Sequence, residues 1–159
     1  MKSKLSYLLV ILLFFGCSKD DENNNETDAP VASEIAAFFN SALPNNGENS
    51  QVFFTDIDSQ KDTCYIVNSL QELQSLYSGD KEIPKIDFNK YTLILGKKIL
   101  TAGYEIEKYS VEDTTEGIVV TLIIRQLEGT FITPLQPNYY WGLNNKLPSK
   151  KSIIKVIKQ

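Results

Sequence analysis

The sequence predicts an α+β fold in which a mostly antiparallel β-sheet is covered by one or two helices, after a signal peptide and a disordered tether. Three features indicate this fold: β-branched and aliphatic runs between residues 91 and 124, two short helical patterns at residues 29–43 and 69–77, and an apolar leader followed by a polar tract. A chain of 159 residues, 42% hydrophobic and 23% charged, fits one globular domain with accessory segments.

The strands of the predicted sheet centre on residues 91–125. Residues 91–95 are an apolar run closed by Gly96, which is typical of a central strand covered on both faces. After Gly103 the pattern alternates between apolar and acidic side chains, as in a strand with one wet face. Residues 113–117 form a turn pattern, so residues 118–124 should return antiparallel, and residues 153–157 should form a last strand.

Two helices are expected on this sheet. Residues 29–43 carry an apolar stripe behind Ser33 as the expected N-cap, and they should pack on the domain or else bind a partner. Ser69 and Glu72 match a capping box, with Leu70, Leu73 and Leu76 or Tyr77 facing inward. Between the helices, residues 51–55 and 63–67 should pair as a hairpin, with Cys64 as a small buried residue.

The N-terminal residues predict where the protein is located. Residues 1–16 combine Lys2 and Lys4 with an apolar run that is shorter than the roughly 20 residues a membrane-spanning helix needs, as in a signal peptide. The leader ends at Gly16-Cys17, which resembles the lipobox of bacterial lipoproteins. That resemblance implies cleavage before Cys17 and lipidation of this cysteine, and several acyl chains anchor a protein stably. An ordinary secretory leader is the alternative.

Residues 17–32 should be an acidic, flexible tether, because they are too polar to pack. Its start, Ser-Lys-Asp-Asp-Glu, is similar to the signal that exports some lipoproteins to the cell surface, although a plain solvated linker explains it as well. We therefore expect a lipid-anchored protein of the outer membrane, with the cell surface as an open alternative. Residues 33–159 should form a single α+β domain.

Composition argues against several classes of function. The sequence contains no histidine, which removes the usual general base, the Ser-His and Cys-His pairs and the commonest metal ligand. It also lacks a Gly-x-Ser-x-Gly elbow and a phosphate-binding loop, so we expect no enzyme and no cofactor. The net charge of −4 argues against nucleic acid as a partner.

Two segments are candidates for binding a partner. Thr101, Gly103 and Tyr104 lie in a small-residue turn, where Gly103 suits a positive φ or a close backbone approach, or where the turn simply joins two strands. Residues 131–141 combine two prolines with four aromatic residues and predict an irregular excursion. Within it, Tyr139, Tyr140 and Trp141 should contact protein or sugar, unless they cover one end of the core.

Two charged segments have ordinary explanations. The aspartates at 56, 58 and 62 are spaced like calcium ligands, but the glycine and glutamate of an EF-hand loop are missing, so we expect a solvated turn and no metal. Five lysines accompany the last strand without one acid, and they either protect an edge strand against pairing or form a basic docking strip.

The order of these segments over residues 63–158 resembles the C-terminal domain of the PrcB family. The most specific part of the resemblance is the Thr-x-Gly-Tyr turn at Thr101, Gly103 and Tyr104, joined by Pro137, Tyr139 and Tyr140 near the end. The resemblance implies a non-catalytic lipoprotein subunit that binds another protein and stabilises a protease complex. The same turn is similar to a loop of chagasin-type protease inhibitors, which leaves protease inhibition as an alternative beside glycan binding.

Overall fold

The computed structural model describes residues 31–43, 52–55, 57, 61–101, 103–129 and 135–159. The expected signal peptide, Cys17 and nearly all of the tether therefore lie outside the described residues. The described chain contains two helices and six strands, in the order α1 (Ser33–Ala42), β1 (Thr63–Val67), α2 (Leu70–Leu76), β2 (Tyr91–Thr101), β3 (Tyr104–Asp113), β4 (Ile118–Gln126), β5 (Leu135–Asn145) and β6 (Ser152–Lys158). The predicted α+β class is confirmed.

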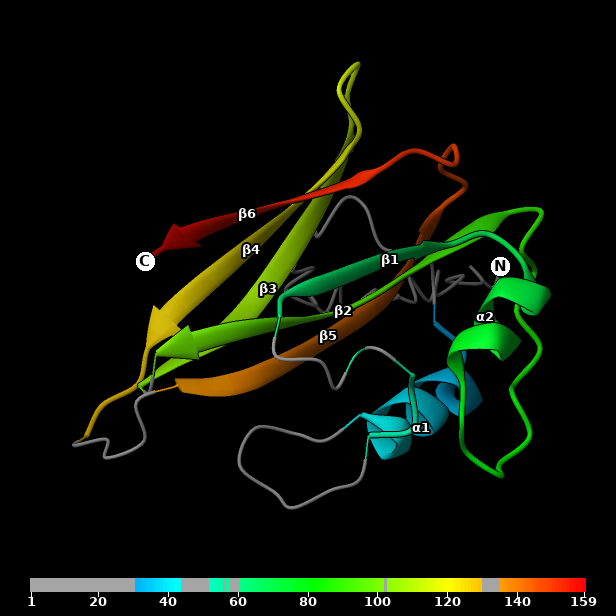
Figure 1. Cartoon of the computed structure of the whole chain (residues 1–159), viewed down its shortest axis with the longest axis horizontal. Helices are drawn as coiled ribbons and strands as arrows, with labels where there is room; N and C mark the ends of the chain where they lie inside the picture. Colours follow the sequence, from blue (N-terminus) through cyan, green and yellow to red (C-terminus); the bar gives the residue numbers. More distant parts are fainter. Residues whose placement is uncertain (1–30, 44–51, 56, 58–60, 102, 130–134) are drawn as a thin grey trace, which may run out of the picture.

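The strands form two three-stranded sheets, which we call sheet A (β1-β2-β5) and sheet C (β3-β4-β6). All pairs are antiparallel except β4 with β6, which run parallel. Both helices lie on the side of sheet A that faces away from sheet C (Figure 1), so the molecule has three layers.

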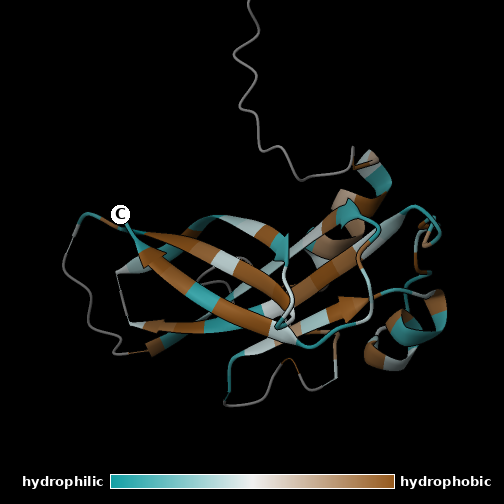
Figure 2. Ribbon diagram, turned by 90° about the horizontal axis from the view of Figure 1, so that it is seen from above, coloured by the Kyte–Doolittle hydropathy of each residue, from teal (hydrophilic) through white to brown (hydrophobic). Residues whose placement is uncertain are grey.

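Sheet A is the middle layer because its residues are apolar on both faces. Alternate residues of β2 point to opposite faces, and Leu93 and Leu95 pack against the helices while Ile94 packs against sheet C. All three are fully buried, which confirms the expected central strand. Figure 2 shows hydrophobic residues concentrated along the strands. However, Gly96 does not end β2, which continues to Thr101 and pairs along its whole length with β5.

Glycines let two tyrosine rings enter the space between the sheets. Gly96 lies opposite Tyr140 across β2 and β5, and a Cβ atom on Gly96 would collide with the Tyr140 ring. Likewise, a Cβ atom on Gly142 would collide with the hydroxyl of Tyr109 from sheet C. The two rings lie 6.2 Å apart between their centroids. Bare backbone at these two positions is therefore what allows sheets A and C to pack over aromatic side chains.

Three predictions on local structure need correction. β1 pairs with β2 instead of with the expected segment 51–55, and within its described residues 52–55 only Phe54 forms a bridge, to Tyr77. Ala32 is the N-cap of α1 without a side-chain hydrogen bond, so Ser33 is the first helical residue rather than the cap. Residues 135–145, expected in part as an irregular excursion, form β5, while residues 130–134 lie outside the described part.

Other predictions are confirmed. The Ser69 hydroxyl accepts a hydrogen bond from the Glu72 backbone amide at 3.2 Å, which is the first half of the expected capping box, while the Glu72 carboxylate accepts from the backbone amide of Asn68 at 2.6 Å. β3 and β4 pair as the expected antiparallel hairpin, and Gly103 has a φ of 87°. β6 lies at the edge of sheet C, where an edge strand lined by lysines was expected.

A candidate binding hollow beside helix α2

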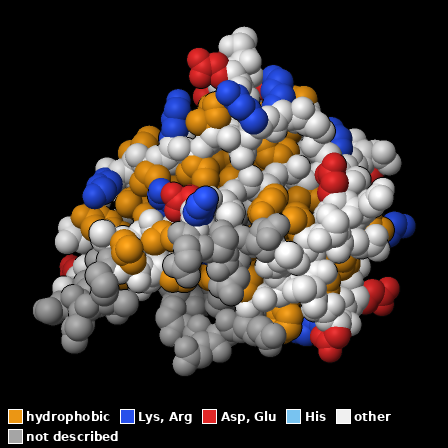
Figure 3. All heavy atoms as spheres, viewed as in Figure 1, with side chains coloured by type: hydrophobic (Ala, Val, Ile, Leu, Met, Phe, Trp, Pro, Cys, Tyr) orange, Lys and Arg blue, Asp and Glu red, His pale blue; other side chains and the backbone are white. Residues whose placement is uncertain are grey.

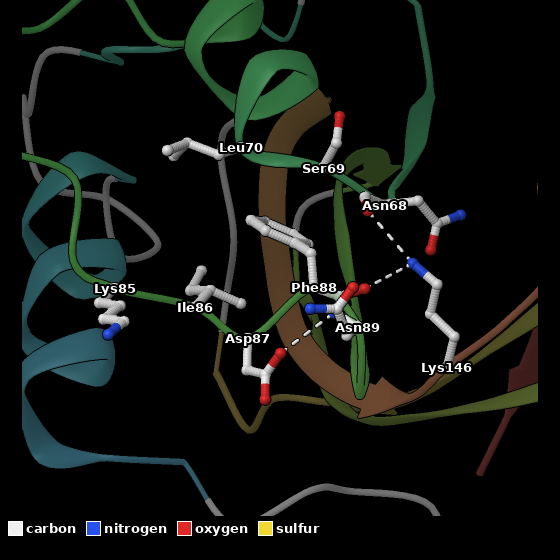
Figure 4. Close-up of a pocket in the computed structure, with 9 residues that line it drawn as sticks. All are labelled: Asn68, Ser69, Leu70, Lys85, Ile86, Asp87, Phe88, Asn89 and Lys146. Carbon is white, nitrogen blue, oxygen red and sulfur yellow. Dashed lines mark hydrogen bonds between the residues drawn. The ribbon is translucent and has the colours of Figure 1, made fainter.

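The end of β1, the start of α2 and the segment leading into β2 enclose a hollow of about 600 Å³. The chain turns at Asn68 and Ser69 to begin α2, and returns without regular structure until β2 begins at Tyr91. Figure 4 shows the side chains that line this hollow. They are Asn68, Ser69, Leu70, Lys85, Ile86, Asp87, Phe88, Asn89 and Lys146.

The apolar part of the hollow consists of Leu70, Ile86 and Phe88, whose side chains lie close together in Figure 4. Ile86 and Phe88 are half-buried and pack against the helix-side core. Leu70 was expected to face inward but is 47% exposed, because a helix of only two turns directs just Leu73 fully into the core. The hollow therefore offers an accessible leucine above an anchored apolar base.

Lys146 fixes the wall of the hollow. Its ammonium group donates to the backbone carbonyl oxygens of Phe88 at 2.7 Å and Asn68 at 3.1 Å, as the dashed lines in Figure 4 show. The Lys146 amide also donates to the Lys90 carbonyl at 2.8 Å. One lysine thus joins the end of β1, the entry to β2 and the end of β5.

Asn68 is the second fixed point. Its side-chain oxygen accepts from the Thr92 hydroxyl at 2.6 Å, and its backbone amide donates to the Glu72 carboxylate at 2.6 Å. The Thr92 oxygen in turn accepts from the Leu147 amide at 2.9 Å. Because each group has a partner, the polar wall is held by the protein rather than being left for a ligand to organise.

Among the described residues, two lysines and one aspartate line the hollow. The Asp87 carboxylate accepts from the backbone amide of Asn89 at 3.2 Å and lies 3.6 Å from the Lys90 ammonium group. Lys85 lines the same hollow and is exposed. The site is therefore an apolar base with a polar rim, and its one carboxylate is already engaged.

A second hollow of about 590 Å³ lies on the other side of Leu70. Besides Leu70 it is lined by Gln74, Tyr77, Gly79, Lys81, Glu82 and Ile83. Leu70 is thus the ridge between two neighbouring hollows, both following the segment that runs from α2 to β2. Sequence reasoning missed this surface, although the shortness of the amphipathic run after Ser69 could have indicated that Leu70 stays partly exposed.

The predicted turn lies elsewhere, between β2 and β3. Thr101 is exposed, and its strand partner Leu135 is 59% exposed. The Gly103 carbonyl accepts from the Leu127 amide at 2.7 Å, and the half-buried Tyr104 ring lies 4.8 Å from the Lys158 ammonium group. Residue 102 lies outside the described residues. The turn offers a small, partly apolar surface distinct from the hollow.

The three aromatic residues predicted as one contact surface are separated by the alternation of β5. Tyr140 is buried between the sheets, and its hydroxyl donates to the Thr63 carbonyl at 3.1 Å. Tyr139 and Trp141 are half-buried on the helix side of sheet A. Trp141 stacks on Phe39 with centroids 4.7 Å apart and donates to the Asn40 side chain at 3.2 Å. They cover the core, which the sequence left open as the alternative.

The half-buried Cys64 lies beside the buried Tyr140, and both groups are neutral at physiological pH. Burial raises the pKa of the Cys64 thiol, although hydrogen bonds from Tyr140 and Ser152 act in the opposite direction. Burial also raises the pKa of Tyr140, with the neighbouring Cys64 adding to the shift. A reactive thiolate needs a lowered pKa and an accessible site. The arrangement therefore fits a packing role for Cys64.

The aspartate loop is only partly described. Asp56 and Asp58 lie outside the described residues, whereas Asp62 forms an ion pair with Lys98 and accepts from the Ile99 amide at 2.9 Å. Among the described residues, no group of three or more acidic or cysteine side chains is placed to hold a metal ion. Within that same part of the chain, no helix has the length and hydropathy needed to cross a membrane.

Comparisons with known proteins give no assignment. No family model matches the chain, and neither a curated protein nor a solved structure matches it.

Proposed function

We propose that this chain is a non-catalytic, lipid-anchored envelope lipoprotein that binds another protein through the two hollows on either side of Leu70. The lipid would be attached at Cys17, and the outer membrane, in its periplasmic or surface-facing leaflet, would be the location. A protease or its complex is the kind of partner that the resemblance to the PrcB family suggests.

The exposed Leu70 is the observation that carries the proposal. Binding sites are typically concave, with an apolar base and a few placed polar groups. Leu70 rises between two such concave areas, and its neighbours Ile86 and Phe88 are anchored in the core. If a partner places an apolar side chain on either side of Leu70, each Å² of apolar surface removed from water stabilises the complex by about 25 cal/mol.

The rigid rim also favours binding without a large change of shape. Lys146 and Asn68 hold three segments of the chain in fixed positions through hydrogen bonds between 2.6 and 3.1 Å. A wall that is already ordered loses little conformational entropy when a partner binds. This property suits recognition and requires no bond to be made or broken.

The test compares two exposed leucines in affinity capture from native membranes. Leu70→Glu places a charge in the hollow and should remove a specific partner that the unmodified chain recovers. Leu135→Glu makes the same change beside Thr101 and serves as the matched control, which should recover the partner unchanged. The opposite pattern would move the binding surface to the turn between β2 and β3. If both variants recover the partner as well as the unmodified chain does, neither surface binds it.

The anchor is tested separately. A Cys17→Ser variant should lose incorporation of labelled fatty acid and retention in the membrane fraction, because the thioether can form only on a thiol. Unchanged labelling would remove the anchor from the proposal without affecting the test of Leu70.

A further inference from the structure

β6 has an open edge whose backbone groups can be assigned individually. The Ile118 amide donates to the Lys151 carbonyl at 2.9 Å, and the Gln159 amide donates to the Ile124 carbonyl at 3.0 Å. Successive residues of a strand direct their backbone groups to opposite sides, so the odd-numbered residues of β6 face β4. The amide and carbonyl groups of Val156 and Lys158 therefore point away from β4, and no other described strand pairs with β6.

The side chains at this end of β6 are also accessible. Val156 is 37% exposed and Ile157 is 50% exposed, on opposite faces of sheet C. Nearer its start, β6 lies against sheet A, where the Ser152 hydroxyl donates to the Cys64 carbonyl at 2.8 Å. The open part of the edge is therefore the C-terminal half of the strand.

Lysines give this edge its charge. Of the five lysines that accompany β6, Lys146 is held by backbone carbonyls and Lys150 forms an ion pair with Asp113. The other three, at positions 151, 155 and 158, are exposed and have no carboxylate partner among the described residues. Figure 3 shows Lys and Arg side chains along the part of the surface where Figure 1 draws β6.

We infer that the C-terminal half of β6 takes up an extended, acidic segment of a partner protein as an additional strand of sheet C. The backbone groups of Val156 and Lys158 would supply the pairing, as in other proteins that bind peptides by strand addition. Val156 and Ile157 would contact apolar side chains of the segment, and Lys155 and Lys158 would select its acidic ones.

The same lysines argue against a second copy of this chain as the occupant. Pairing of β6 with another β6 would bring the lysines of one copy against those of the other, and like charges placed across a strand pair are destabilising. The repulsion that protects the edge against self-association is an attraction for an acidic strand. This inference concerns sheet C and does not depend on the hollow beside Leu70.

The experiment uses the full chain in detergent and a fluorescent probe peptide of sequence Glu-Val-Asp-Val-Glu-Ile. Its uncharged match is Gln-Val-Asn-Val-Gln-Ile. We expect the acidic peptide to bind roughly tenfold more tightly than the uncharged one, and this advantage should shrink as salt is raised to about 0.5 M. Hydrogen exchange of the Val156 and Lys158 amides should slow when the acidic peptide binds, whereas the Ile157 amide is already paired with β4.

Two variants make the test specific. Val156→Pro removes an amide that has no partner in the free chain, so the fold should persist while peptide binding is lost. Ile157→Pro is the matched control, because it removes an amide that pairs with β4 and should lower the melting temperature. If Val156→Pro does not fold, the double variant Lys155→Glu and Lys158→Glu serves instead. It should lose the acidic peptide and gain a lysine-substituted one.

Three results would overturn the inference. They are no binding of either peptide, equal binding of the acidic peptide to the unmodified chain and to a folded Val156→Pro variant, and a dimer of the free chain that Val156→Pro dissociates. The last result would mean that a second copy occupies the edge.

Discussion

At the scale of single residues, Gly142 decides how closely the two sheets pack. A Cβ atom at this position would lie closer to the Tyr109 hydroxyl than real Cβ atoms approach any neighbour. We expect Gly142→Ala to lower the free energy of unfolding by about 2–3 kcal/mol, in the range seen for overpacked cores. Urea denaturation measures the change.

The control for this prediction is the Tyr109 hydroxyl. In a Tyr109→Phe background, the nearest remaining ring carbon would lie 2.8 Å from the added Cβ atom, so Gly142→Ala should cost less than it does alone. An equal cost in both backgrounds would show that the hydroxyl is not the obstacle.

A second prediction at this scale concerns pH. The pKa values of Cys64 and Tyr140 are raised in the folded state because burial disfavours their charged forms. In the unfolded chain both groups ionise near their ordinary values of 9.0 and 10.0. Their contribution to stability is therefore fully present below those values and is lost as pH rises above them. Stability should fall between about pH 9 and 11, and should fall less in a Tyr140→Phe variant.

The Phe variant also removes the hydrogen bond from the Tyr140 hydroxyl to Thr63, so it should be less stable than the unmodified chain near neutral pH. The informative quantity is thus the slope of stability against pH, measured by urea denaturation. Identical slopes in the two chains would show that Tyr140 does not carry the alkaline loss.

Some of these residues were predictable and others were not. The positive φ of Gly103 was predictable, because a glycine in a turn of small residues readily adopts this conformation. The positions of Tyr139, Tyr140 and Trp141 follow equally simply once β5 is recognised, since alternation alone sends Tyr140 to the other face. Pro137 obscured the strand, although proline is tolerated at the edge of a sheet, where β5 lies.

At the scale of elements, the Lys146 side chain links the end of β5 to the end of β1 and to the segment before β2, which has no regular secondary structure. Lys146→Ala removes two hydrogen bonds from an ammonium group to backbone carbonyl oxygens, and hydrogen bonds to charged groups contribute about 1.5–3 kcal/mol each. Because the lysine is exposed, we expect a smaller loss, of about 1–2 kcal/mol, together with faster proteolysis of residues 80–90.

Lys151→Ala is the matched control, because the Lys151 side chain is exposed and its ammonium group forms no ion pair with a carboxylate among the described residues. It should leave both stability and the cleavage rate unchanged. If Lys146→Ala behaves in the same way, the two carbonyl contacts do not hold the segment.

At this scale, local sequence patterns predict which elements form but not all of their pairings. The existence of α1, α2 and all strands except β5 follows from periodicity and capping, which are local. The partner of β1 does not, because residues 51–55 and β2 both offer apolar strand sequences. β2 prevails because Cys64 and Ile66 then face sheet C while Tyr65 and Val67 face the helices, so both faces of β1 are covered. Such a choice depends on layers that only the complete fold brings together.

At the scale of the whole molecule, sheet A belongs to both cores, which predicts one cooperative unit. Leu93 and Leu95 contribute to the helix-side core, and Ile94, between them, contributes to the core between the sheets. Neither core can be lost without exposing one face of the same strand. Helix and sheet layers should therefore unfold together, as small single domains usually do.

Phe39→Ala tests this coupling. Phe39 is fully buried and stacks on both Phe54 and Trp141, so its truncation should cost about 3–5 kcal/mol. The single tryptophan reports on the helix layer by fluorescence, and the Tyr109–Tyr140 pair contributes to the near-ultraviolet circular dichroism of the core between the sheets. Both transitions should move to lower urea by the same amount. Ala37→Ser, at an exposed position of α1, should move neither. A shift of the fluorescence transition alone would mean that the helix layer unfolds as a unit of its own, and that sheet A retains its packing on β3, β4 and β6 without it.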